Sequence, residues 1–242
     1  MIRIAAIELT KYLRAFVIII ICYFLFATIL EIRLEAKGFF QYGTFDFDAF
    51  KVVNSSFIGL IRSAIPFTII LNVCNEFKNG YALKLISNGL SRTSYCSFKF
   101  ILAGTLSVAS TFLYALIDSF LLGFQKTAYF DWTIFASSLV LEFLFSMFFS
   151  SIAVALAILL RSWQYTLLAY YIYATVEVVV VLRFQESTAW VKYLPFNLAS
   201  SIFALQAVPE RFTDYLLPVS ILIPCCSITV WCAYYFFKNV DL

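Results

Sequence analysis

The sequence predicts an all-α integral membrane protein, with six transmembrane helices in a single transmembrane domain over residues 1–242. Of its 242 residues, 63% are hydrophobic and 19% are aromatic, while 13% are charged. A soluble domain has about 45–50% apolar and about 25% charged residues. A water-soluble fold therefore has too little polar side chain to cover this much apolar surface.

A membrane-spanning helix needs about 20 mainly apolar residues. Windows of that kind fall at residues 15–30, 54–75, 100–124, 133–160, 164–182 and 215–237. The first window extends back to about Tyr12 and no small-residue cleavage site follows it, which favours a retained span over a signal peptide. Six spans put both termini on one side, and the basic residues at the corresponding span ends favour the cytoplasm for that side.

Two further segments indicate helices that do not cross the membrane. Residues 1–14 place most of their apolar side chains on one helical face, which predicts an amphipathic elbow helix on the inner membrane surface. A frayed N-terminus is the alternative. The outer segment 183–214 contains an apolar run over Leu198–Ala207, of a length that suits a re-entrant helix between spans five and six better than a span.

The inner loop between spans two and three predicts a short helix over Tyr81–Ser87. Gly80 precedes this stretch, and Asn88-Gly89 after it is a strong helix stop signal. A second helix is expected to start at Ser91. The short helix would lie parallel to the membrane and would be exposed to a soluble partner.

This loop resembles the permease subunits of ABC-2 type ABC exporters, particularly the small six-span bacterial kind. Their pattern is an acidic residue after span two, a Gly-Thr-like step, a short apolar and basic helix, a Gly or Pro, Ser-Arg, and a Lys that opens span three. The chain supplies Glu76, Gly80-Tyr81, Leu83-Lys84-Leu85-Ile86, Gly89, Ser91-Arg92 and Lys99. Tyr81 replaces the more usual Thr.

The resemblance implies the permease half of an ATP-driven exporter in a bacterial cytoplasmic membrane. Two ABC ATPase subunits, which would hold ATP and magnesium, are expected to dock on the loop, and a second six-span permease subunit completes a homodimer or heterodimer in membrane lipid. The implied cargo is amphipathic, with a toxin-like or antimicrobial peptide as the first guess. The expected ATPase-coupling residues are Glu76, Tyr81, Lys84, Leu85, Asn88 and Arg92.

No catalytic residue, metal ligand or cofactor is expected in the chain itself. It has no His, and it has no G-x-x-x-x-G-K-[ST] loop that could hold the phosphates of ATP. None of its six Cys residues forms a C-x-x-C pair, so they are interpreted as structural. ATP hydrolysis is therefore expected in a separate partner chain.

Four charged residues fall within the predicted spans: Arg62, Asp118, Glu142 and Glu177. Charge inside a span is costly and is a functional hypothesis by default. At about 1.5 Å per residue, the four lie about 21–28 Å from the inner ends of their spans. One cation among three acids at matched depth indicates a charge network.

The same region carries the predicted translocation pathway. Thr166, Tyr170, Tyr173 and Glu177 share one helical face of span five, while Ser55 and Arg62 share one face of span two. Spans two and five line the route in the family that the chain resembles. The alternative is that the four charges pair within one subunit and only hold helices together.

Two other classes of function stay open from the sequence. An ion-coupled secondary transporter would use Asp118, Glu142 or Glu177 to carry the coupling proton. A membrane assembly subunit without a transport role would need none of them. A nucleic-acid partner is not expected, because the basic residues lie along the membrane edge and form no separate patch.

Overall fold

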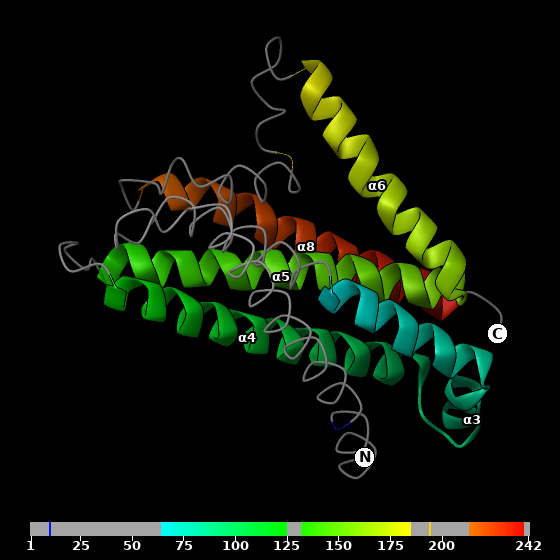
Figure 1. Ribbon diagram of the computed structural model, residues 1–242. Helices are drawn as coiled ribbons and strands as arrows, with labels where there is room; N and C mark the ends of the chain where they lie inside the picture. The colour runs from blue at the N-terminus through cyan, green and yellow to red at the C-terminus, as the bar shows by residue number, and fades with distance from the viewer. Residues whose placement is uncertain (1–9, 11–63, 125–131, 185–193, 195–212, 240–242) are drawn as a thin grey trace, which may run out of the picture.

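The structure is a computed structural model that describes Thr10, residues 64–124, residues 132–184, Leu194 and residues 213–239. Within these ranges it contains six helices and no strand. Figure 1 shows a helix over 64–78, followed by α3 (Tyr81–Ser87), α4 (Arg92–Phe124), α5 (Trp132–Leu160), α6 (Trp163–Phe184) and α8 (Thr213–Asn239).

Four of these helices contain a stretch that is long and apolar enough to cross a membrane. The stretches are Arg92–Leu116, Leu139–Leu160, Trp163–Val181 and Val219–Asn239. The all-helical class is thereby confirmed for the described part of the chain, and four of its helices could cross a membrane by their length and composition.

The predicted spans 100–124, 133–160, 164–182 and 215–237 each lie inside one long helix. α4 starts well before its predicted span, at Arg92, because helical hydrogen bonding continues through polar residues that a hydropathy window leaves out. The predicted elbow helix (apart from Thr10, which is helical), the first span, the first half of the second and the re-entrant helix lie outside the described residues.

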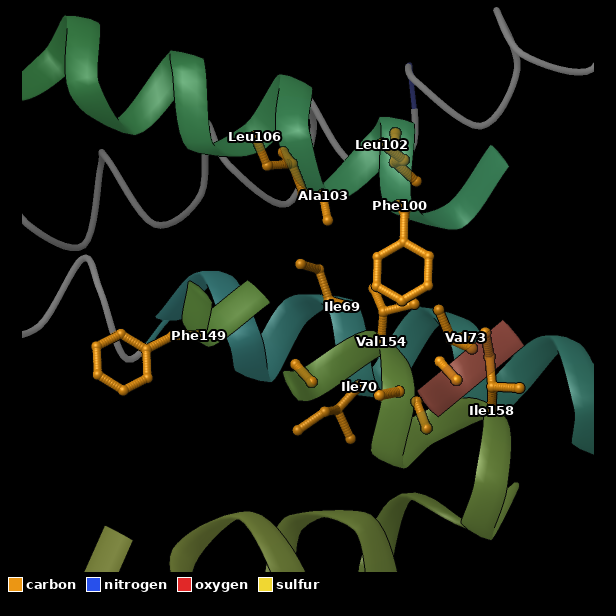
Figure 2. Packing of buried hydrophobic residues seen from close by; sticks show 14 of the residues in the cluster. Ile69, Ile70, Val73, Phe100, Leu102, Ala103, Leu106, Phe149, Val154 and Ile158 are labelled. Atoms are coloured by element: carbon orange, nitrogen blue, oxygen red, sulfur yellow. The ribbon is translucent and has the colours of Figure 1, made fainter. Parts of the chain in front are cut away.

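α5 is the central helix of the described bundle. It packs against α4, α6 and α8, and 61% of its membrane-spanning stretch is buried, compared with 11% for those of α6 and α8. A helix that is apolar on all sides is suited to such a central place. Figure 2 shows part of the core, where Val154 and Ile158 of α5 meet Ile70 and Val73 of the helix over 64–78.

The short helix α3 begins and ends at the residues that the sequence predicts. Gly80 (φ 67°) and Gly89 (φ 95°) flank it in left-handed conformations, which glycine adopts without a steric penalty. Three hydrogen bonds then close its C-terminal end: the N–H groups of Asn88, Gly89 and Leu90 donate to the carbonyls of Lys84 (3.0 Å), Ile86 (3.0 Å) and Leu85 (3.1 Å), respectively.

The start of α4 was also predicted correctly to within one residue. Ser91 caps the helix, because its Oγ accepts a hydrogen bond from the Ser94 N–H at 3.0 Å. The reversal between α3 and α4 is thus fixed by one glycine and one capping serine.

Two glycine substitutions are expected to change stability in opposite directions. Gly89→Ala should lower the free energy of unfolding by about 1 kcal/mol, because the left-handed conformation at Gly89 is costly for a side chain. Gly104→Ala should raise it by about 0.5–1 kcal/mol, because the new Cβ in the middle of α4 meets only the Met147 Sδ at 3.8 Å. Thermal denaturation of the purified protein in detergent tests both. Midpoints that shift in the same direction would contradict the left-handed backbone at Gly89 or the open space beside Gly104.

Candidate functional site

A buried ion pair joins the helix over 64–78 to α4. The Lys99 Nζ donates to the Glu76 Oε1 at 2.6 Å, and the Tyr95 hydroxyl donates to the Glu76 Oε2 at 2.8 Å. The Lys99 side chain is 1% exposed and the Glu76 side chain is 13% exposed, so the cation is fully buried and the carboxylate largely so. Both carboxylate oxygens are therefore engaged, which offsets the cost of removing the two charges from water.

Aromatic rings surround this ion pair and connect it to other helices. Phe77, Tyr95 and Phe237 form a cluster with ring centroids 5.8–6.2 Å apart. The Lys99 ammonium lies 5.2 Å from the centroid of the Tyr95 ring, and the Arg161 guanidinium lies 5.8 Å from that of Phe77. One compact cluster thus joins the helix over 64–78, α4, α8 and the α5–α6 junction.

α3 has one face against the bundle and one face in contact with the surroundings. Ala82 is fully buried, and Leu85 and Ile86 pack against the core. Tyr81 (37% exposed) and Leu83 (45% exposed) point away from it. These apolar side chains form an exposed surface. The sequence predicted the helix but not which of its side chains are exposed and which are buried.

The predicted ATPase-coupling residues therefore divide into two groups. Tyr81, Lys84 and Asn88 are exposed. Leu85 is half-buried on the inner side of α3, and Arg92 is half-buried as the first residue of α4. Glu76, the sixth, belongs to the buried ion pair.

The junction between α5 and α6 consists of Arg161 and Ser162. Arg161 has φ 55° and its N–H donates to the Ala157 carbonyl at 3.0 Å, so it ends α5 with its cationic side chain near the negative end of the helix dipole. The Ser162 carbonyl accepts from both the N–H (2.9 Å) and the hydroxyl (2.7 Å) of Thr166. α6 thus begins at once after the turn.

Most of the predicted pathway residues of α6 lie on its inner face. Thr166, Tyr170 and Glu177 are buried, and Tyr173 is half-buried and shares a side-chain hydrogen bond with Glu177. The Thr166 Oγ1 lies 3.5 Å from the Cys74 Sγ on the helix over 64–78. The opposite face of α6 is apolar and exposed, at Tyr165, Leu168, Ile172, Val176 and Val179.

Of the four predicted intramembrane charges, the structure describes two side chains. Glu142 of α5 is 1% exposed and Glu177 of α6 is 5% exposed. Ser55 and Arg62 lie outside the described residues, as does the side chain of Asp118. Within the described ranges, no three Cys, Asp or Glu side chains gather in a way that could hold a metal ion.

Sequence reasoning did not foresee the Glu76–Lys99 pair or the role of Tyr95. Lys99 was placed at the membrane edge as the residue that opens span three. Its neighbours Phe98 and Phe100 were the available signal, because a lysine between two large apolar residues is seldom exposed along its whole length. The sequence does not show which acid pairs with this lysine, because Asp118 lies 19 residues after it and Glu76 lies 23 residues before it.

A shallow apolar groove of about 460 Å³ lies at the junction of α4, α5 and α8. Its lining contributes no polar surface. The residues are Thr111, Leu139, Val140, Phe143, Leu144, Val219 and Ile223. Such a lining offers apolar contact and no group that could fix the orientation of a polar ligand.

Removing the cation alone from the buried pair should destabilise the protein strongly. Lys99→Met leaves the Glu76 carboxylate, which is only 13% exposed, without its counter-charge, and we expect a loss of about 3 kcal/mol, the lower end for a buried pair, in the free energy of unfolding, measured by thermal denaturation in detergent. The double variant Glu76→Gln/Lys99→Met should regain most of that loss because both charges are gone. Lys84→Met, on the exposed side of α3, is the control, and a similar loss in the control would contradict this assignment.

Comparison with known proteins finds no family model and no curated protein that matches the chain. The resemblance of residues 76–99 to ABC-2 permeases therefore stays an inference from the sequence. Function is proposed below from that resemblance together with the geometry of the described residues.

Proposed function

We propose that the chain is the permease half of an ATP-driven ABC exporter. The observation that carries the proposal is α3 itself, a short ordered helix whose inner side is fixed to the bundle while Tyr81, Leu83 and Lys84 are exposed. Aromatic and aliphatic side chains on such a surface, next to a cation, are typical of a protein contact. The expected partners are two ABC ATPase subunits that hold ATP and magnesium.

The ion pair next to α3 would transmit a movement of α3 to the helix over 64–78 and to α4. Glu76 lies in the last turn of the helix over 64–78 and Lys99 lies on α4, so a push on α3 would act on both helices. The ring of Phe237 and the guanidinium of Arg161 lie against the same cluster, which extends the route to α8 and to the start of α6. Closure of the ATPases would then tilt spans two and five, which are expected to line the pathway.

The exposed apolar faces of α6 and α8 fit the remaining partners. A second six-span permease subunit, identical or similar, would cover part of this surface, and membrane lipid would cover the rest. The proposed cargo is amphipathic, with a toxin-like or antimicrobial peptide as the first candidate. The buried Glu177 and the tyrosines beside it would contact its polar groups. The proposed location is the bacterial cytoplasmic membrane, with both termini in the cytoplasm.

An ion-coupled secondary transporter is the second candidate. The burial of Glu142 and Glu177 favours it, because an intramembrane carboxylate can carry a coupling proton. The two candidates differ in their energy source. Transport that persists without ATP and stops when the proton gradient is removed would favour the second.

Affinity purification in mild detergent is expected to recover an ABC ATPase with the chain. Tyr81→Ala/Lys84→Ala should release it, since loss of an anchoring tyrosine costs about 2 kcal/mol or more at a protein interface. Ser87→Ala, exposed on the same helix, is the matched control and should retain the ATPase. Recovery of the ATPase with both variants would place the contact elsewhere, and its absence from the unaltered protein would count against the exporter.

Leu85→Ala separates a contact role from a packing role. Because Leu85 is half-buried against the core, this substitution should lower the free energy of unfolding by about 1–2 kcal/mol, less than for a fully buried leucine, and should leave the exposed surface of α3 in place. We therefore expect weaker folding but a normal ATPase content per folded molecule. A loss of ATPase binding at unchanged stability would instead place Leu85 in the contact.

Glu177→Gln tests the pathway. The amide keeps the shape of the side chain and its hydrogen bond with Tyr173 while removing the charge. We expect ATP-driven uptake of a fluorescent amphipathic peptide into inside-out vesicles to fall about tenfold, which corresponds to about 1.4 kcal/mol, with ATPase binding unchanged. Val176→Ala, on the exposed face of α6, is the control, and normal uptake by Glu177→Gln would exclude this role.

A further inference from the structure

One face of α5 differs from the rest of this apolar helix. It carries Glu142, Ser146, Ser150, Ala153 and Ala157, each at most 3% exposed. At about 100° per residue, these five positions fall within about 80° of one another. The face is therefore a buried stripe with polar side chains at one end and small ones at the other.

This stripe leads toward the end of the bundle at which α3 lies. The Ala157 carbonyl is 4.0 Å from the Cys74 Sγ, which in turn lies 3.5 Å from the Thr166 Oγ1. Val154, one position along from the stripe, packs beside Ile70 and Val73 (Figure 2). The stripe therefore faces the helix over 64–78 at this end and reaches the start of α6.

Two hydroxyls on the stripe are unpaired. Neither the Ser146 Oγ nor the Ser150 Oγ has a hydrogen-bond partner in the part of the chain that the structure describes. Two other buried serines bond to their own helix: the Ser107 hydroxyl donates to the Ala103 carbonyl at 2.9 Å, and the Ser151 hydroxyl donates to the Met147 carbonyl at 2.7 Å. Ser110 on α4 is a third buried serine whose Oγ has no partner among the described residues, but it stands alone, whereas Ser146 and Ser150 lie on successive turns of α5.

An unpaired buried hydroxyl costs about 1–3 kcal/mol, so two on successive turns need a partner. Residues four apart on a helix are separated by about 6 Å along the axis. One water that accepts from one hydroxyl and donates to the next bridges about 4.5 Å at its near-tetrahedral angle, and a chain of two waters bridges up to about 7 Å. The spacing of Glu142, Ser146 and Ser150 therefore suits short chains of one or two water molecules.

We propose that Glu142, Ser146 and Ser150 form a hydrated site inside the bundle. The two hydroxyls hold water molecules that connect the Glu142 carboxyl group with the α3 end, along the small side chains of Ala153 and Ala157. This gives Glu142 a route by which it exchanges protons with water. The site is assigned from the geometry of α5 and does not depend on the exporter function.

Cysteine labelling in membrane vesicles tests the site. In a chain whose native cysteines are replaced by Ala, Ser146→Cys and Ser150→Cys are compared with Ser107→Cys and Ser151→Cys, which are equally buried but replace hydroxyls bonded to their own helix. The reagent is a small positively charged methanethiosulfonate, added to one side of the membrane at a time. Labelling of Ser87→Cys, which is exposed on α3, shows that the reagent has access to the α3 side.

A thiol reacts as the thiolate, which water stabilises and an apolar core suppresses, so we expect the two site cysteines to react about tenfold faster than the two controls. The two site cysteines should react faster when the reagent is added on the side of the membrane from which it labels Ser87→Cys. Rates equal to those of the controls would overturn the proposal, as would labelling from the opposite side alone.

A second measurement needs no cysteine replacement. If the two hydroxyls are dry, Ser146→Ala/Ser150→Ala removes unpaired polar groups and leaves the denaturation midpoint unchanged or raises it. If they hold water, the double variant loses those hydrogen bonds, and we expect the midpoint to fall by about 2–4 °C. An unchanged or higher midpoint would overturn the proposal.

Discussion

The buried contact between Glu76 and Lys99 is the constraint on which the inner end of the bundle depends. Its two groups are 23 residues apart in sequence and belong to two helices with α3 between them. Removal of both charges from water is costly, so the two helices must stay in register to keep the oxygen and nitrogen atoms together. α3 has a defined position because the chain leaves one side of this contact and returns to the other.

The position of α5 explains how the other helices are arranged. α5 fills the centre of the described bundle, whereas α6 and α8 keep one face inward and leave the other uncovered (Figure 1). An uncovered apolar face is stable in lipid and equally available to another helix. A bundle with such faces is suited to assembly with a second subunit, and this property underlies the proposed half-transporter.

The local features were predictable because the signals for them are local. Gly80 and Asn88-Gly89 defined α3, Ser91 defined the start of α4, and apolar windows located the four long helices. Lys99 was predicted only as a membrane-edge residue, because no pattern in one sequence shows which acid a cation meets across two helices. That Ser146 and Ser150 have no hydrogen-bond partner among the described residues was beyond prediction for a related reason: it depends on side-chain rotamers and on what packs against α5.

The short connection at Arg161 and Ser162 has a consequence for how α5 and α6 are oriented relative to each other. Because the turn contains no slack, α5 and α6 form one helical hairpin, and neither can be rotated without the other. One residue inserted into the first turn of α6 would rotate the rest of that helix by about 100° about its axis relative to the connection. The carboxylate of Glu177 would then face hydrocarbon, and the exposed valines would face the bundle. The number of residues between this connection and Glu177 therefore sets the side of α6 on which the carboxylate lies.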